Sequence, residues 1–144
     1  MSTRLKEKQE KILLILEALA EESAEGKPIV VEGKKDVAAL RTQGVKGTVL
    51  TVKTGGKSFL DAVCEIEKMG VPEVILFMDF DRRGKEGTKQ LKDNLERNKI
   101  KANTKLWLTL SSTAGKEIQC IESLTAYLHT LHEKISAQRK PKFT

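Results

Sequence analysis

The feature that most constrains the fold is a continuous apolar run that ends in charged residues. The run Val74–Met78 is followed directly by the segment 79–84, which reads Asp-Phe-Asp-Arg-Arg-Gly. Five apolar residues in succession predict a β-strand that is buried on both faces. Alternation along an extended chain places the carboxylates of Asp79 and Asp81 on the same side. Because Mg²⁺ binds one or two carboxylates and completes its shell with water and phosphate oxygens, this pair is a candidate metal site.

The composition of the 144-residue chain is typical of one globular domain, with 39% hydrophobic and 32% charged residues. A net charge of +6 favours a polyanionic partner, and the low aromatic content of 4% argues against a broad base-stacking platform. Cys64 and Cys120 lie far apart and belong to no metal-binding motif. The first residues are charged, and no apolar run approaches the ~18 residues of a membrane span. The sequence therefore predicts a cytoplasmic protein without a membrane partner.

Apolar periodicity and Gly/Pro breaks predict strands that alternate with helices. We expect strands at 28–33, 48–52, 74–78 and 105–110, and helices at 4–24, 34–42, 58–69, 85–98 and 118–135, with a turn at Gly55-Gly56, a loop at 111–115 and a basic tail at 138–144. This alternation indicates an α/β fold with a mainly parallel four-stranded sheet and right-handed crossovers.

Acidic residues end two of the predicted strands. Glu32 ends the first strand, and Asp79 and Asp81 end the third. In open parallel sheets, ligands bind beyond the carboxyl ends of the strands, where the strand order reverses. If the order is 2-1-3-4, the first and third strands are neighbours and the three carboxylates meet at one edge. Pattern and topology alone therefore predict a metal site there.

The two strand-end motifs resemble those of the Toprim domain, which primases, topoisomerases and several nucleases share. The first motif is Val31-Glu32-Gly33-Lys34-Lys35-Asp36, and the second is the segment 79–84. The likeness covers about residues 27–132, and the chain is most similar to small stand-alone Toprim proteins of archaea and bacteria. The resemblance implies a single Rossmann-like domain at 27–132, preceded by an added helix at 1–26 and followed by a basic tail at 133–144.

The resemblance also implies roles for individual residues. Glu32 matches a glutamate with a general acid/base or metal-binding role, and Asp79 and Asp81 match the pair that coordinates Mg²⁺, or Mn²⁺ in its place. All three acids are thus implied to be catalytic and metal-binding. Gly33 and Gly84 match the glycines that let the backbone turn beside the site.

Basic residues flank both motifs. The simplest interpretation is charge balance, but their position favours contacts with phosphates, which orient a nucleic-acid backbone without reading its sequence. These phosphate-binding candidates are Lys34, Lys35, Arg82 and Arg83. Lys57 follows two glycines, but the segment is no P-loop, because Thr51 stands where that motif requires glycine.

Four further residues have simple structural interpretations. His129 and His132 lie three residues apart on a predicted helix with no third ligand nearby, which favours a solvated face. Tyr127 falls on the apolar stripe of the same helix, so we expect a core residue and not a DNA-cleaving nucleophile. Trp107 is interpreted as a packing residue.

Two functions remain open at the level of sequence. The first is a Mg²⁺-dependent nuclease acting on RNA or DNA, in which Glu32 activates water or protonates the leaving oxygen. The second is a non-catalytic nucleic-acid-binding module or a subunit of an RNA- or DNA-processing complex. In that case the helix at 1–26 is a docking element for a protein partner or a second copy of the chain.

Overall fold

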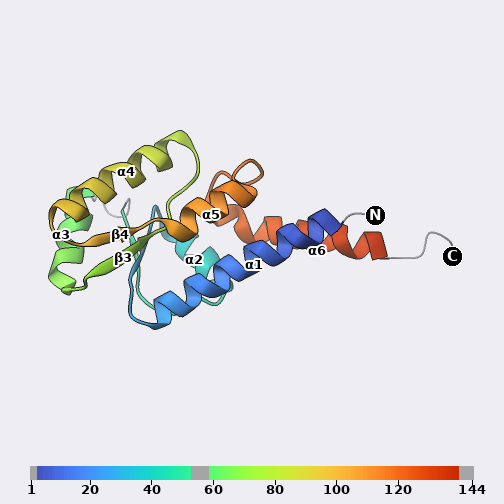
Figure 1. Cartoon of the computed structure of the whole chain (residues 1–144), viewed down its shortest axis with the longest axis horizontal. Coiled ribbons are helices and arrows are strands. Elements are labelled where there is room, and N and C mark those ends of the chain that lie inside the picture. The colour runs from blue at the N-terminus through green and yellow to red at the C-terminus, as the bar shows by residue number, and fades with distance from the viewer. Residues whose placement is uncertain (1–2, 53–58, 140–144) are drawn as a thin grey trace.

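Helices cover both faces of a short parallel sheet in the computed structural model, which describes residues 3–52 and 59–139 (Figure 1). In chain order the elements are α1 (Thr3–Ala24), β1 (Ile29–Val31), α2 (Lys34–Thr42), β2 (Val49–Thr51), α3 (Phe59–Met69), β3 (Glu73–Leu76), α4 (Arg82–Arg97), β4 (Lys101–Asn103), α5 (Lys105–Ala114), the 3-10 turn η2 (Ile121–Ser123) and α6 (Leu124–Arg139). The predicted turn at Gly55-Gly56, Lys57 and residues 140–144 of the predicted tail lie outside the described residues.

The sheet has the order β2-β1-β3-β4, and its three strand pairs are all parallel. This confirms the predicted order 2-1-3-4. In the register of the central strands, Val30 lies opposite both Leu50 of β2 and Leu76 of β3. Because β1 and β3 are direct neighbours, the residues that follow their carboxyl ends are brought to the same edge of the sheet.

Alternation along the central strands divides the core into two layers. Ile29, Val31 and Ile75 pack with apolar residues of α1, α2, α5 and α6. Val30 and Leu76 point to the other face and pack with residues of α3 and α4. All five side chains are buried, so the apolar runs in the sequence correctly indicated strands covered on both faces.

The segment 105–110, predicted as the fourth strand, is instead part of the helix α5, and β4 is the short strand just before it. The buried residues of α5 are Trp107, Leu110 and Ala114, which have the spacing of one helix face, whereas Leu108 is 56% exposed. The side chain of Asn103 accepts a hydrogen bond from the backbone N–H of Lys105 and so helps this helix to begin. The predicted loop at 111–115 is wrong as well, since α5 continues to Ala114.

Two other helix boundaries differ from the prediction. The helix α4 begins at Arg82 and not at residue 85, because Asp81 caps it. The helix α6 begins at Leu124 and not at residue 118, because the chain first forms the turn η2 beside the segment that follows β3. The helix α6 extends to Arg139, so it includes residues 138 and 139 of the tail expected at 138–144 and residues 133–139 of the wider C-terminal segment 133–144.

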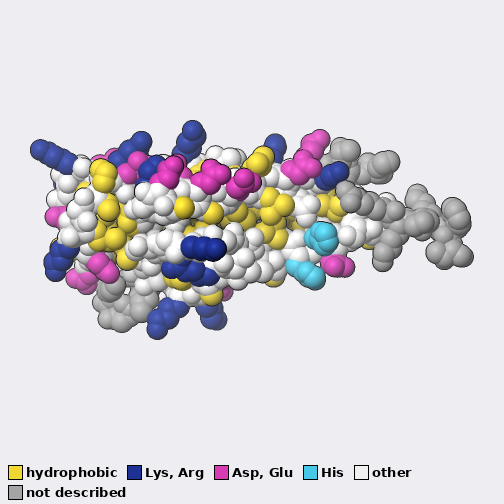
Figure 2. All heavy atoms as spheres, turned by 90° about the horizontal axis from the view of Figure 1, so that it is seen from below, with side chains coloured by type: hydrophobic (Ala, Val, Ile, Leu, Met, Phe, Trp, Pro, Cys, Tyr) yellow, Lys and Arg dark blue, Asp and Glu magenta, His cyan; other side chains and the backbone are white. Residues whose placement is uncertain are grey.

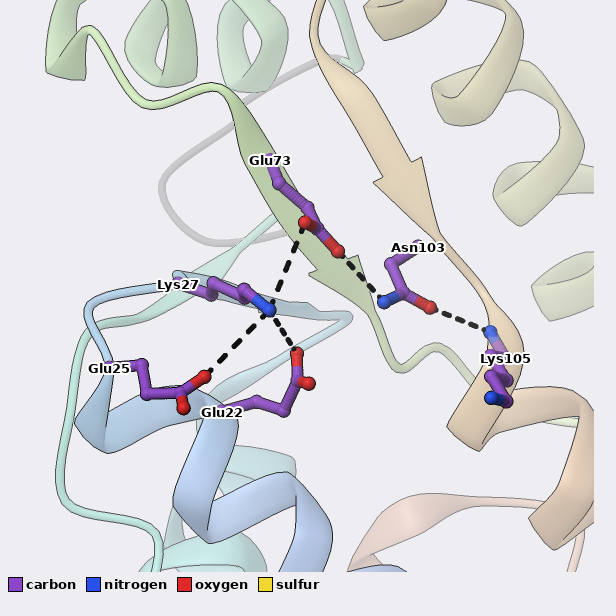
Figure 3. A network of polar contacts seen from close by, with 6 residues as sticks. All are labelled: Glu22, Glu25, Lys27, Glu73, Asn103 and Lys105. Atoms are coloured by element: carbon purple, nitrogen blue, oxygen red, sulfur yellow. Dashed lines mark hydrogen bonds and ion pairs between the residues drawn. The ribbon is translucent and has the colours of Figure 1, made fainter.

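A polar network fixes the carboxyl end of α1 to the sheet (Figure 3). The Lys27 ammonium donates to Glu22 at 2.7 Å and lies 3.8 Å from a carboxylate oxygen of Glu73, the first residue of β3. Glu73 in turn accepts from the side-chain amide of Asn103 at 2.8 Å. The network holds α1 at the amino end of β3, away from the edge where Asp79 lies.

The helix α1 packs along α5 and α6, and Figure 1 shows α1 and α6 extending together beyond the sheet. From the side shown in Figure 2, acidic and basic side chains are interspersed over the surface. Within residues 3–52 and 59–139, every helix is too short or too polar to cross a membrane.

Candidate functional site

Two acidic side chains meet where the central strands end. Glu32 follows β1 directly, and Asp79 lies three residues beyond β3. Both residues are buried, with exposed fractions of 8% and 9%. Their carboxyl groups lie within hydrogen-bonding contact, and a proton on Asp79 would serve as the donor. The structure therefore brings together Glu32 and Asp79, two of the three acids that the sequence placed at this edge, and their binding of a metal stays a prediction.

The environment of Asp79 favours the protonated form. Burial raises its pKa to about 8, and the hydrogen bond with Glu32 and the negative charges of Asp36 and Glu32 act in the same direction. The backbone N–H of Ile121, which donates to Asp79 Oδ1 at 3.1 Å, opposes this rise. The raised pKa favours a proton on Asp79 at neutral pH.

The chemistry of this pair fits Mg²⁺. Both carboxyl groups are hard oxygen donors at the rim of the sheet, and Mg²⁺ is commonly held by one or two carboxylates together with water and phosphate oxygens. A cation would also offset the repulsion between two buried carboxylates, the repulsion that helps to raise the pKa of Asp79. Within the part of the chain that the structure describes, no three Asp, Glu, His or Cys side chains are grouped as ligands of one ion. The arrangement suits a two-carboxylate site.

Asp81 makes a hydrogen bond that is separate from the contact between Glu32 and Asp79. Its side chain is exposed, and its Oδ1 accepts a hydrogen bond from the backbone N–H of Gly84 at 2.8 Å. This makes Asp81 the N-cap of α4 and satisfies one of the free amides at the start of that helix. The metal-binding role of Asp81 stays a prediction.

The two glycines of the motifs differ in what the structure requires of them. Gly84 is buried in the first turn of α4, and a Cβ there would overlap the carbonyl group of Asp79, with the carbonyl carbon 2.6 Å away. Only glycine therefore lets α4 begin this close to Asp79. Gly33 has an extended backbone with φ −146°, and a Cβ there would meet no atom within 4 Å, so other residues would also fit.

Asp36 connects the first motif to a distant segment. It is 5% exposed, its Oδ2 accepts from the N–H of Gly33 at 3.0 Å, and its Oδ1 accepts from the N–H of Glu122 at 3.1 Å. Burial raises the pKa of Asp36, while these two backbone bonds lower it. From the sequence Asp36 could be a first-turn acid of the helix at 34–42 or a peripheral member of the site, and the first interpretation was favoured. Nothing in the sequence pointed to the bond with Glu122.

The segment 119–122 contacts the site through backbone hydrogen bonds. The carbonyl oxygen of Gln119 accepts from the N–H of Phe80 at 2.7 Å, and the amides of Ile121 and Glu122 donate to Asp79 and Asp36. The sequence placed this segment in the first turn of a helix. Its contribution comes from backbone groups, which every residue carries, so no pattern of side chains could have revealed it.

Trp107 on α5 holds the chain just before Asp79. Its buried indole N–H donates to the carbonyl oxygen of Met78 at 2.8 Å, and its ring stacks on that of Phe80 with centroids 5.9 Å apart. The predicted packing role is confirmed by burial, but the polar bond to Met78 was missed. Trp107 and Gln119 thus fix the backbone on both sides of Asp79.

The basic residues of the two motifs surround the start of two helices. Lys34 and Lys35 lie in the first turn of α2, and Arg82 and Arg83 lie in the first turn of α4. All four are exposed. The guanidinium of Arg82 also pairs with Glu86 at 3.1 Å along the helix. Their contact with phosphates stays a prediction.

The remaining candidates lie on α6. His129 and His132 are exposed (Figure 2), and Tyr127 is half-buried and packs against the core. The hydrogen bonds described above for Asp79, Asp36 and Phe80 come from the segment 119–122 and from Gly33, and not from these three side chains.

Comparisons with known proteins bear on the same region. The family model of the Toprim domain matches residues 26–104, a range that includes both motifs and ends before α5. A UPF0292 protein of Methanocaldococcus jannaschii is 40% identical over 121 residues, which cover 83% of this chain and 91% of the relative. A UPF0292 protein of Methanosarcina acetivorans is 32% identical over 126 residues, covering 87% of this chain and 85% of the relative. A solved structure of a protein from Aquifex aeolicus has a TM-score of 0.64 and 27% sequence identity, and the match covers 76% of this chain and 94% of that one.

Proposed function

Because this chain belongs to the Toprim domain family, whose members process nucleic acids, we propose that it is a Mg²⁺-dependent nuclease acting on the phosphodiesters of RNA or DNA. The observation that carries the proposal is the contact between the buried carboxyl groups of Glu32 and Asp79 at the carboxyl edge of the sheet. Two neighbouring buried carboxyl groups are suited to acid/base chemistry and to binding a divalent cation.

The residues of the pair divide the chemistry between them. Asp79 and Glu32 would hold Mg²⁺, which supplies charge stabilisation for an in-line displacement at phosphorus. Glu32 would take a proton from the attacking water or give one to the leaving oxygen. The contact between Glu32 and Asp79, which raises the pKa of Asp79, supports a role for this pair in proton transfer. The amide of Ile121 keeps Asp79 oriented during these steps.

The surroundings of the pair favour an anionic substrate. The helices α2 and α4 both begin beside it, and helix amino ends attract phosphates through free amides and the helix dipole. The exposed side chains of Lys34, Lys35, Arg82 and Arg83 lie in these first turns. They would position the phosphodiester backbone and neutralise its charge, without selecting a base sequence.

One observation favours the alternative of a non-catalytic nucleic-acid-binding module or a subunit of a processing complex. Asp81, the third acid expected at the site, caps α4. If two carboxylates serve only to hold a cation that bridges to nucleic acid, binding can occur without cleavage. In that case α1 would be the docking element for a protein partner or for a second copy of the chain.

A cleavage assay separates the two functions. Purified protein is incubated with labelled RNA and DNA at a series of Mg²⁺ and Mn²⁺ concentrations, together with the variants Glu32→Gln and Asp79→Asn. The matched control is Asp93→Asn, which removes an exposed carboxylate from α4. We expect metal-dependent cleavage by the wild type and the control and at least a hundredfold loss in the two site variants. Binding without cleavage of any substrate would support the module instead.

Salt dependence tests the nucleic-acid partner separately. If the exposed lysines and arginines contact phosphates, affinity falls steeply with salt, because each contact releases condensed counterions. The quadruple change of Lys34, Lys35, Arg82 and Arg83 to Gln should weaken binding and flatten this dependence. A salt response that is flat in the wild type would contradict a nucleic-acid partner.

A further inference from the structure

A buried carboxylate beside the pair has no part in the chemistry above. Asp36 is as buried as Glu32 and Asp79, yet each of its two oxygens accepts a hydrogen bond from a backbone amide. One amide belongs to Gly33, the residue next to Glu32. The other belongs to Glu122, which lies 86 positions further along the chain.

These two bonds lead to both members of the pair. The amide of Gly33 fixes the backbone directly after Glu32 at the start of α2. The residue directly before Glu122 in the same short turn is Ile121, and its amide donates a hydrogen bond to Asp79. Adjacent amides of η2 therefore hold the side chains of Asp36 and Asp79. The turn is further tied to the chain after β3, since the carbonyl of Gln119 accepts from the amide of Phe80.

We propose that Asp36 is a positioning residue of this site, which holds Asp79 against Glu32 by clamping η2 to the first turn of α2. One half of the clamp, η2, lies outside the region that the family model covers, since η2 follows residue 104, whereas Asp36 and Gly33 lie inside it. The C-terminal part of this chain is thus a component of the site and not only a packing element. The expected effect of Asp36 on cleavage rests on the nuclease function proposed above. Its effect on the position of η2 does not.

The clamp requires both carboxylate oxygens. An amide side chain has one acceptor oxygen and one NH₂ donor, so Asp36→Asn would set a donor against one of the two backbone amides. That change keeps the size of the side chain and breaks one bond. Because an ångström of displacement between reacting groups has a large effect on rate, loosening of η2 should lower turnover more than substrate binding.

The test measures the turn and the reaction in the same variant. Hydrogen exchange of individual amides, followed by NMR, is compared in the wild type, in Asp36→Asn and in the exposed control Asp93→Asn. We expect the Ile121 amide of Asp36→Asn to exchange at least tenfold faster, while core amides such as that of Leu76 change only with overall stability. In the cleavage assay we expect kcat to fall at least tenfold with KM changed by less than threefold. Asp36→Glu, which restores both acceptor oxygens, should recover part of each effect.

Each outcome decides the proposal. If the exchange of Ile121 changes only in step with the core amides, or if kcat is unaffected in a folded Asp36→Asn variant, the positioning role is overturned. If the wild type cleaves no substrate, the proposed nuclease function fails, and the exchange of Ile121 still decides whether Asp36 holds the turn. If Asp36→Asn does not fold, the exchange of the Ile121 amide and the values of kcat and KM are measured in Asp36→Glu instead. We then expect changes in the same direction but smaller.

Discussion

Replacing Asp79 by asparagine should remove a pH dependence from the stability of the metal-free protein. Burial and the hydrogen bond to Glu32 raise the pKa of Asp79 from 3.8 to about 8 in the folded chain. In the unfolded chain the same group loses its proton near its ordinary value. Between these two values unfolding releases a proton, so the free energy of unfolding falls as the pH rises. Above about pH 8 the folded group is ionised as well, and this loss ends.

The magnitude follows from the proton balance. One proton released per unfolding event lowers the free energy of unfolding by ~1.4 kcal/mol for each pH unit. From pH 5.5 to 7.5 this gives at most ~2.7 kcal/mol. Because solvent reaches this edge of the sheet and Glu32 shares the proton, we expect about half of that value, ~1.3 kcal/mol. Asparagine keeps an acceptor for the Ile121 amide and a donor for Glu32, but it has no proton to lose.

Urea unfolding followed by circular dichroism, in the presence of EDTA, provides the measurement. The difference in free energy of unfolding between Asp79→Asn and the wild type should rise by ~1.3 kcal/mol from pH 5.5 to 7.5 and level off above pH 8. The exposed control Asp93→Asn should show a difference that does not change with pH. A constant difference for Asp79→Asn would refute the reasoning, because it would mean that Asp79 is ionised in the folded protein throughout this range.

Three further perturbations test other parts of the site. Mg²⁺ added at pH 7.5 should raise the melting temperature of the wild type but not of Asp79→Asn, and equal shifts in a thermal scan would contradict binding at this residue. Gly84→Ala should cost ~1–3 kcal/mol in urea unfolding, because the new Cβ overlaps the carbonyl of Asp79, whereas Gly33→Ala should be close to neutral. Trp107→Phe keeps an aromatic ring but leaves the buried carbonyl of Met78 without its donor, so we expect a loss of ~1–3 kcal/mol in urea unfolding. A neutral result for either Gly84→Ala or Trp107→Phe would show that the backbone around residue 79 adjusts freely.

The arrangement of the sheet could be predicted because its determinants are local. The apolar run Val74–Met78 identifies a strand buried on both faces, and the strand order 2-1-3-4, which the structure confirms, makes the first and third strands neighbours. The contact between Glu32 and Asp79 follows from that topology alone. The segment 105–110 was mistaken for a strand because leucines at 106, 108 and 110 alternate. The same residues also fit a helix in which Trp107 and Leu110 share one face.

The polar connections of the site could not be predicted, because one partner in each is a backbone group. Asp36 and Asp79 accept from amides of η2, and Trp107 donates to the carbonyl of Met78. Every residue carries these groups, so they leave no pattern in the sequence. Only the spacing between Gly33 and Asp36, an acid at the third position of a helix, indicates a local bond of the capping type.

Asp81 illustrates how two roles compete for one side chain. The spacing from Asp81 to Gly84 is that of an N-cap, and the observed bond to the Gly84 amide stabilises α4 by about 1 kcal/mol. A carboxylate has two oxygens, so one can keep this bond while the other turns to a cation beside Asp79. The close packing of Gly84 against the Asp79 carbonyl limits how far the first turn of α4 can follow such a movement. The glycine therefore does more than permit a turn, because it lets the capped start of α4 pack directly against the backbone of Asp79.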